Sequence, residues 1–235
     1  MVDIKNYFND WSSWEKSWLG VSTILIFIAS IWTWDSTNQV GSWAALLSSI
    51  TGIWCVVLVA KAKISNYIWG LINVVLYAYA AYTWKLYGDF MLNAFYFLPM
   101  QFVGWYIWTN PKFMTDKDDV VSLFLSNKAR IAWVSVSVGL IFGYGLILKG
   151  IGGNTPFFDS TSTVLSVIAM ILMAKLYMEQ WIAWIIVDIA TVIMWANIVF
   201  VEGGLFNFGI LIMWIAWLIN AVYGYFNWVK IHRNN

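Results

Sequence analysis

The feature that most constrains this chain is a succession of eight apolar stretches, each close to the length that crosses a lipid bilayer. A membrane-spanning helix needs about 20 mostly apolar residues to cross about 30 Å of hydrocarbon. The stretches are uniformly apolar and do not alternate with a period of two, so they predict helices and argue against a barrel. They lie near residues 18–34, 43–60, 67–84, 90–108, 131–148, 157–177, 181–201 and 205–228. We therefore expect an all-α, polytopic membrane protein with about eight transmembrane helices.

Composition excludes several classes of protein. Only 11% of the residues are charged, against about 25% in a typical soluble domain. Lys and Arg total 13 and Asp and Glu total 12, which gives a nucleic-acid partner no electrostatic footprint. The chain has one cysteine, Cys55, and one histidine, His232. We therefore expect no disulfide, no metal site and no cofactor. A membrane enzyme is also disfavoured, because the spans contain no histidine and no carboxylate pair for catalysis.

The distribution of cations predicts the orientation. With a cytoplasmic amino terminus, eight crossings place Lys85 and Lys149 outside and every other Lys and Arg inside. The inside group is Lys5, Lys16, Lys61, Lys63, Lys112, Lys117, Lys128, Arg130, Lys175, Lys230 and Arg233. This asymmetry follows the positive-inside rule. Both termini are expected in the cytoplasm.

The amino-terminal segment 1–17 carries aromatic residues at helical spacing with charged residues between them. This pattern predicts an amphipathic helix at the cytoplasmic interface, which serves as an anchor. The first transmembrane helix then covers residues 18–34.

Two parts of the sequence resemble each other. Trp69-x-x-x-Asn73 is matched by Trp184-x-x-x-Asp188, and in both a glycine follows 15 residues later. The next spans end in Gly-Trp-Tyr-Ile-Trp and Gly-Tyr-Phe-Asn-Trp. The pattern indicates an internal repeat.

The repeat and the orientation together predict an architecture. Residues 41–109 and 157–229 are expected to be two three-helix repeats that run in the same direction. The helix at 127–149 links them and restores the direction, and the helix at 18–34 is an addition. Parallel repeats of this kind occur in transporters that hold their substrate between the repeats.

Polar residues deep in the spans are the candidate site, because an unpaired polar group in hydrocarbon costs several kcal/mol. Asp188 is the single carboxylate deep in any span, and Asn73, Gln101 and Asn220 are deep amides. Indoles accompany them at helical spacing, so a flat, cationic ligand could stack on the indoles while the polar groups read its edge. The alternative is that the amides are hydrogen-bonding contacts between helices.

Most tryptophans are expected to belong to belts at the two membrane interfaces. This group comprises Trp18, Trp34, Trp43, Trp84, Trp108 and Trp228. Pro99 removes one backbone hydrogen bond just before Gln101, and the resulting kink is either a hinge or a static bend.

The Trp69–Asn73 pair, the Trp181-x-x-Trp184-x-x-x-Asp188 motif, the two three-span repeats and the high tryptophan content resemble PnuC, the bacterial nicotinamide riboside transporter family. The resemblance covers about residues 18–228. It implies a 3+1+3 core similar to the SWEET sugar transporters, a homotrimer in the bacterial inner membrane, and uptake of a vitamin B3 nucleoside. It also implies facilitated diffusion, made unidirectional when the substrate is phosphorylated in the cytoplasm. Relatives carry thiamine or riboflavin, and an ion-coupled symporter with Asp188 as the ion site is the other alternative.

The pyridinium ring of nicotinamide riboside is flat and cationic, which suits stacking between indoles. We expect stacking by Trp181 and Trp184 and polar contacts from several amides and one carboxylate. The predicted substrate-binding residues are Asn73, Gln101, Trp105, Trp181, Trp184, Asp188, Asn207 and Asn220.

Overall fold

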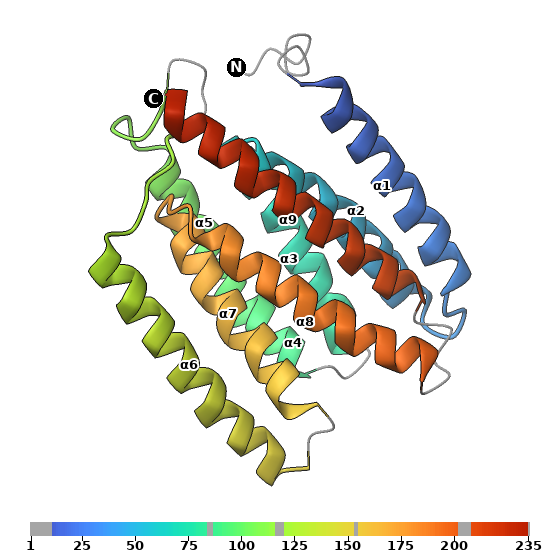
Figure 1. Ribbon diagram of the computed structural model, residues 1–235. Coiled ribbons are helices and arrows are strands. Elements are labelled where there is room, and N and C mark those ends of the chain that lie inside the picture. Colours follow the sequence, from blue (N-terminus) through green and yellow to red (C-terminus); the bar gives the residue numbers. More distant parts are fainter. Residues whose placement is uncertain (1–10, 84–86, 116–119, 153–154, 202–207, 235) are drawn as a thin grey trace.

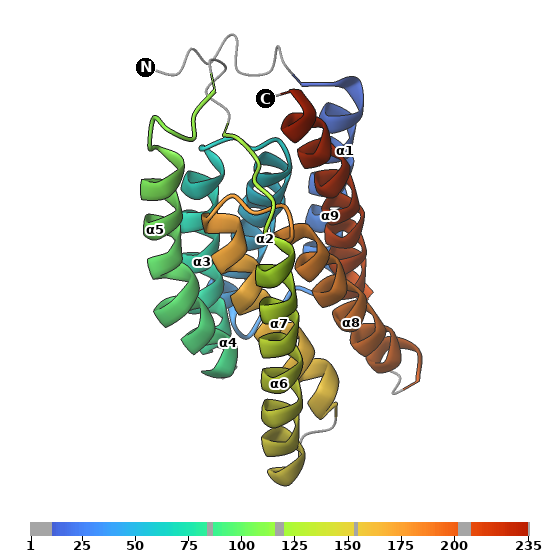
Figure 2. The same ribbon diagram turned by 60° about the vertical axis from the view of Figure 1, so that its left-hand side comes forward.

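The computed structural model describes residues 11–83, 87–115, 120–152, 155–201 and 208–234, whose regular structure is helical. The helices are α1 (Ser13–Trp32), α2 (Gln39–Ala60), α3 (Asn66–Thr83), α4 (Tyr87–Leu92), the π-helix η1 (Asn93–Phe97), α5 (Leu98–Trp108), α6 (Asn127–Gly150), α7 (Pro156–Ala174), α8 (Gln180–Phe200) and α9 (Phe208–Asn234). Because α4, η1 and α5 follow one another without a break, they form one column (Figure 2). The predicted all-α fold class is confirmed.

Five of the described helices are long and apolar enough to cross a membrane by themselves: α1, α2, α6, α7 and α8 as far as Asn197. In the bundle, α1 lies at one edge against α2 and α9, and α6 lies at the opposite edge against α7 (Figure 1). The start of α1, the end of α5 and the end of α9 share one end of the bundle (Figure 1). We call it the Lys-rich end, because Lys61, Lys128, Lys175 and Lys230 lie there.

The fourth column changes its helical geometry just before Pro99. Residues Asn93–Phe97 form a π-helix, and α5 starts at Leu98 with the proline in its first turn. A proline lacks the N–H that an α-helix needs and its ring collides with the preceding turn, so a wider turn before it relieves the conflict. The irregularity predicted at Pro99 therefore takes the form of the π-helix η1.

The internal repeat is visible in the backbone of two turns. Ala62 and Leu176, which lie 114 positions apart, both have a positive φ, of 57° and 65°. The Ala62 N–H donates to the Val59 carbonyl at 2.9 Å, and the Leu176 N–H donates to Met173 at 2.9 Å. In each turn the next N–H also donates to the carbonyl five residues before it, from Lys63 to Leu58 and from Tyr177 to Leu172. This pair of bonds makes both turns Schellman caps.

These caps set the register of the repeat at 114 positions, whereas the motif comparison gave 115. In the structural register Val187 is the counterpart of Asn73, and Val74 is the counterpart of Asp188. The polar residues of the two copies therefore stand one position apart, and the predicted pairing of Asn73 with Asp188 is wrong by one residue.

The additional helix α1 is attached to the repeats by a buried ion pair. Ser12 and Glu15 form a capping box at its start. The Glu15 carboxylate, 3% exposed, lies 2.9 Å from Lys61 Nζ and accepts a hydrogen bond from the Tyr223 hydroxyl at 2.6 Å. Residues 13–17, which the sequence assigned to a separate interfacial helix, are the first turn of α1; residues 1–10 of that helix lie outside the described residues.

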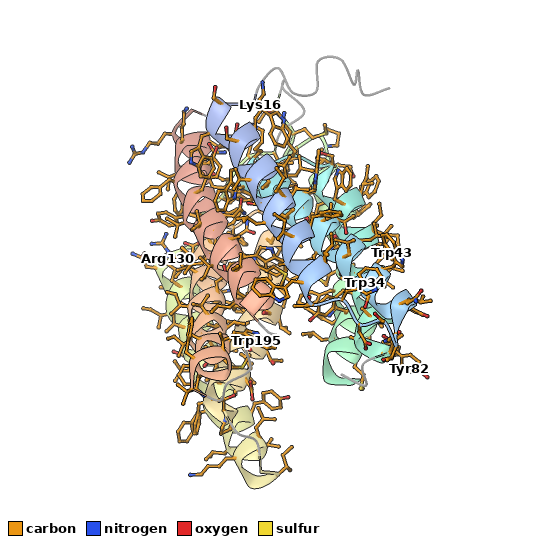
Figure 3. All side chains as sticks on the ribbon, turned by 90° about the vertical axis from the view of Figure 1, so that its right-hand side faces the viewer. Lys16, Trp34, Trp43, Tyr82, Arg130 and Trp195 are labelled. Atoms are coloured by element: carbon orange, nitrogen blue, oxygen red, sulfur yellow. The ribbon has the colours of Figure 1, made fainter. Side chains whose placement is uncertain are left out.

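The predicted tryptophan belt divides into two groups. Trp43 is 55% exposed, and it lies with Trp34 and Tyr82 away from the end that bears Lys16 (Figure 3). Trp108 and Trp228 are 0% exposed and belong to the main hydrophobic core. The belt assignment of these two is wrong, because each indole lies between the repeats. Trp84 lies outside the described residues.

The connection between α5 and α6 becomes part of the core shortly before α6 begins. In segment 120–125 the Val120 N–H donates to Ala62 and the Leu123 N–H donates to Leu176, at 3.1 and 2.9 Å. These acceptors are the two equivalent cap residues of the repeats. Ser122 adds a hydrogen bond to the Trp228 carbonyl at 3.0 Å. The segment thus joins both repeats at the Lys-rich end.

Candidate functional site

Two of the predicted amides donate hydrogen bonds to backbone carbonyls of helix α2. Asn73 of α3 donates from Nδ2 to the Ser48 carbonyl at 2.7 Å, and Asn220 of α9 donates to the Val56 carbonyl at 3.0 Å. One amide comes from each repeat, so α2 lies at the junction between the repeats. These bonds also fulfil the alternative interpretation, in which amides connect helices.

Gln101 of α5 lies close to the same helix, α2. Its side chain is 7% exposed, and a methyl group added at Gly70 would lie 2.5 Å from Oε1 and 3.1 Å from Cys55 Sγ. The glycine therefore leaves the space that the Gln101 amide fills. Asn73, Gln101 and Asn220 all border α2 within about two helical turns of one another.

Several polar side-chain atoms of α5, α8 and α9 are buried without a hydrogen-bond partner in the described part of the chain. Among them are Gln101 Oε1, Asn220 Oδ1, Trp181 Nε1 and Trp217 Nε1. Buried polar atoms in native proteins nearly always have a partner, so an orphaned group marks a place for water or a ligand. Two acceptors and two donors are thus available between the repeats.

The two predicted stacking indoles lie on α8 beside this region. Trp181 is 3% exposed and packs against Gly224, where an added methyl group would collide with its ring. Trp184 is half-buried and contacts two hydrophobic clusters, one around Trp108 and Trp228 and the other around Leu172 and Val187. Both indoles come from the second repeat.

Asp188 is 4% exposed on the same helix, one turn beyond Trp184. It is therefore a buried carboxylate within a membrane-spanning helix, as the sequence predicted. A charge in this position needs a compensating partner or a functional reason.

One predicted residue is not brought to this group, and another cannot be located because it falls outside the described residues. Trp105 is 39% exposed on α5, although Gln101 one turn earlier is buried. Asn207 lies outside the described residues, as does Gly203 of the repeat motif.

The structure adds residues that the sequence analysis did not single out. A methyl group at Gly52 would lie 2.8 Å from Asn73 Nδ2 and 3.5 Å from the Trp217 ring. The signal available in the sequence was a glycine on each of two adjacent helices, since small residues allow helices to approach in membranes. A separate groove of about 440 Å³ between α3 and the α4–α5 column contains none of the predicted site residues.

Two parallel three-helix repeats, a linking helix and polar atoms buried between the repeats define a membrane transporter of the parallel-repeat class. The sequence matches the family model described as "Nicotinamide mononucleotide transporter" over residues 42–230. The chain belongs to this family.

Curated relatives support the assignment. A nicotinamide riboside transporter PnuC from Neisseria mucosa is 34% identical and covers 98% of this chain and 86% of its own length. The PnuC of Haemophilus influenzae is 33% identical over 97% of this chain and 94% of its own length. A crystal structure of the vitamin B3 transporter PnuC superimposes with a TM-score of 0.76 at 35% identity, over 97% of this chain and 95% of that one.

Proposed function

We propose that this protein takes up nicotinamide riboside across the bacterial cytoplasmic membrane by facilitated diffusion. The observation that carries the proposal is the set of unpaired polar atoms of Gln101, Asn220 and Trp181, buried where the two repeats meet. The curated relatives are named nicotinamide riboside transporters over nearly the full chain.

The chemistry of the substrate fits this group of side chains. Its flat cationic ring would stack against Trp184, with Trp181 beneath it, and Asp188 would balance its charge. Its carboxamide and ribose hydroxyls would pair with Gln101 and Asn220. Asn73, Asn207 and Trp105 complete the proposed set.

The orientation and the assembly are part of the proposal. The Lys-rich end would face the cytoplasm, and with it both termini, as the positive-inside rule implies. The homotrimer follows from the family resemblance, and cross-linking of the protein in native membranes would test it: bands stopping at the trimer support it, and bands stopping at the dimer contradict it.

Uptake of labelled nicotinamide riboside into liposomes that contain the purified protein tests the function. We expect uptake that saturates, needs no ion gradient, and is not reduced by excess thiamine or riboflavin. Empty liposomes are the control. Uptake of thiamine or riboflavin in place of nicotinamide riboside would contradict the substrate.

The second candidate function is ion-coupled symport, which the buried carboxylate of Asp188 favours. Imposed proton and sodium gradients distinguish the two mechanisms. A carrier that works by facilitated diffusion equilibrates its substrate and is indifferent to both gradients, whereas a symporter accumulates its substrate above the external concentration.

A further inference from the structure

Four aromatic side chains form a row across the boundary between the repeats. Tyr67 meets Trp108 edge to face with 5.1 Å between ring centroids, Trp108 meets Trp228 at 5.9 Å, and Trp228 meets Trp181 at 5.9 Å. All four are between 0% and 3% exposed. We call them the aromatic row.

The row has the symmetry of the repeats. Tyr67 and Trp181 are equivalent residues at the starts of α3 and α8, in the register that the two caps define. Trp108 and Trp228 end the matching Gly-x-x-x-Trp segments of α5 and α9. The contact between Trp108 and Trp228 is therefore the point where one repeat meets the other.

Hydrogen bonds connect each central indole to the opposite repeat. Trp108 Nε1 donates to the Met173 carbonyl of α7 at 3.1 Å, and Trp228 Nε1 donates to the Val59 carbonyl of α2 at 2.8 Å. Val59 and Met173 are equivalent residues in the last turns of their helices, and each carbonyl also accepts a cap hydrogen bond, from Ala62 and Leu176 respectively. The connection is reciprocal, so separating the repeats at this end breaks both bonds.

The closed row also leaves neighbouring polar groups without partners. Gln180 is 0% exposed, and neither atom of its amide has a partner among the described residues. Its repeat counterpart Asn66 is 0% exposed, with Oδ1 in the same state. Water would satisfy these groups if the repeats moved apart at this end, which would offset part of the cost of breaking the row.

We propose that the aromatic row is the gate at the Lys-rich end, held closed by the reciprocal Trp108 and Trp228 hydrogen bonds and opened when the repeats move apart. This inference rests on the proposed transport function and places the exit of the substrate. In the closed state the row lies between the Lys-rich end and the amides on α2.

Cys55 is a natural reporter for the gate, because it is the single cysteine of the chain. It lies beside the Gln101 amide, one helical turn before Val59, and thus on the site's side of the row. A membrane-impermeant maleimide that arrives from the Lys-rich end must pass the row to reach it.

The experiment measures maleimide labelling of Cys55 from each side separately, in membrane vesicles of both orientations. In the double variant Trp108→Phe/Trp228→Phe a smaller aromatic ring remains at each position and both hydrogen bonds are lost. We expect labelling from the Lys-rich end to rise about tenfold, with labelling from the opposite end unchanged. Trp133→Phe, on α6 and outside the row, is the matched control and should label like the unmodified protein.

Unchanged labelling in the double variant, or an equal rise from both sides, would overturn the gate. If the double variant does not fold, the two single variants carry the test, and the symmetry predicts similar, smaller rises for both. Labelling needs no substrate, so it succeeds or fails independently of the uptake experiment that tests the proposed function.

Discussion

The two repeats agree at the Lys-rich end and differ in the middle of the membrane. Near the turns they share the positive-φ caps at Ala62 and Leu176 and the same backbone hydrogen bonds. Further along the following helices, the repeat counterpart of Asn73 is Val187 and that of Asp188 is Val74. A gate that opens by moving two similar halves benefits from equal halves, whereas an asymmetric solute needs different groups on its two sides.

A second difference concerns the lysines that follow the first helix of each repeat. Lys61 is buried and paired with Glu15 of α1, while its counterpart Lys175 is exposed. The additional helix α1 therefore completes the first repeat in a way that has no equivalent in the second.

The largest effect is expected at this ion pair. Glu15→Ala should lower the free energy of unfolding by about 3–5 kcal/mol, because it removes the carboxylate that forms the buried ion pair with Lys61. Lys175→Ala, the matched change in the other repeat, should cost less than about 0.5 kcal/mol. Thermal unfolding in detergent measures both, and equal effects would contradict the difference between the repeats.

The glycines that receive the row's outer rings test the symmetric part. Gly104→Ala and Gly224→Ala would place a methyl group against Tyr67 and Trp181 respectively. Each should cost about 1–3 kcal/mol through overpacking. The same thermal unfolding assay applies, with Gly139→Ala on α6 as the control because that position has open space around it. A loss at one glycine alone would show that the repeats do not share this packing.

Substrate affinity tests the asymmetric part. Asp188→Val, which installs the residue of the first repeat, should weaken nicotinamide riboside binding more than about tenfold, because a charge-assisted contact is lost. Gln101→Ala and Trp184→Ala should also weaken binding more than about tenfold. Isothermal titration calorimetry measures each affinity, and size-exclusion chromatography checks the fold. Unchanged affinity in Gln101→Ala and Trp184→Ala would remove the site assignment.

The smallest effect is expected at Asn73. Asn73→Val, which copies the second repeat, removes the bond to Ser48 and should cost about 0.6 kcal/mol, the typical value for a hydrogen bond between membrane helices. Ser49→Ala changes another α2 hydroxyl, which bonds within its own helix, and serves as the control in thermal unfolding. A loss of several kcal/mol at Asn73 would make it a main connection between α2 and α3.

The helical spans could be predicted from the sequence because hydrophobic length alone decides them. The register of the repeat was one position off, because the motif comparison aligned Trp69 with Trp184, which are not equivalent. The identical pairs Ala60-Lys61 and Ala174-Lys175 carry the register of the caps, but two residues are too short a match to stand out in the sequence. Trp108 and Trp228 look like belt residues because an indole near a helix end suits the interface and a core equally. Glu15 and Lys61 are 46 positions apart, and nothing local shows that they meet.

The sequence indicated which polar residues lie deep in the helices, and it indicated their arrangement less well. Asn73, Gln101 and Asn220 were identified because amides are rare in hydrocarbon. The space for their amides beside α2 depends on Gly52 and Gly70. These glycines can be recognised as neighbours of the amides only once the helices are packed. Trp105 lies one helical turn after Gln101 and was therefore expected on the same face of the helix, yet the packing of α5 leaves it exposed.

Segment 120–125 has a consequence for how such a protein could be divided. Because it bonds to the cap residues of both repeats, the stretch after α5 is a shared component of the two halves and more than a tether. A chain split between α6 and α7 would keep this component with the first half and should reassemble when the fragments are co-expressed. A split inside 120–125 would remove the segment that bonds to both caps, and the two halves would then lack the contact that aligns them.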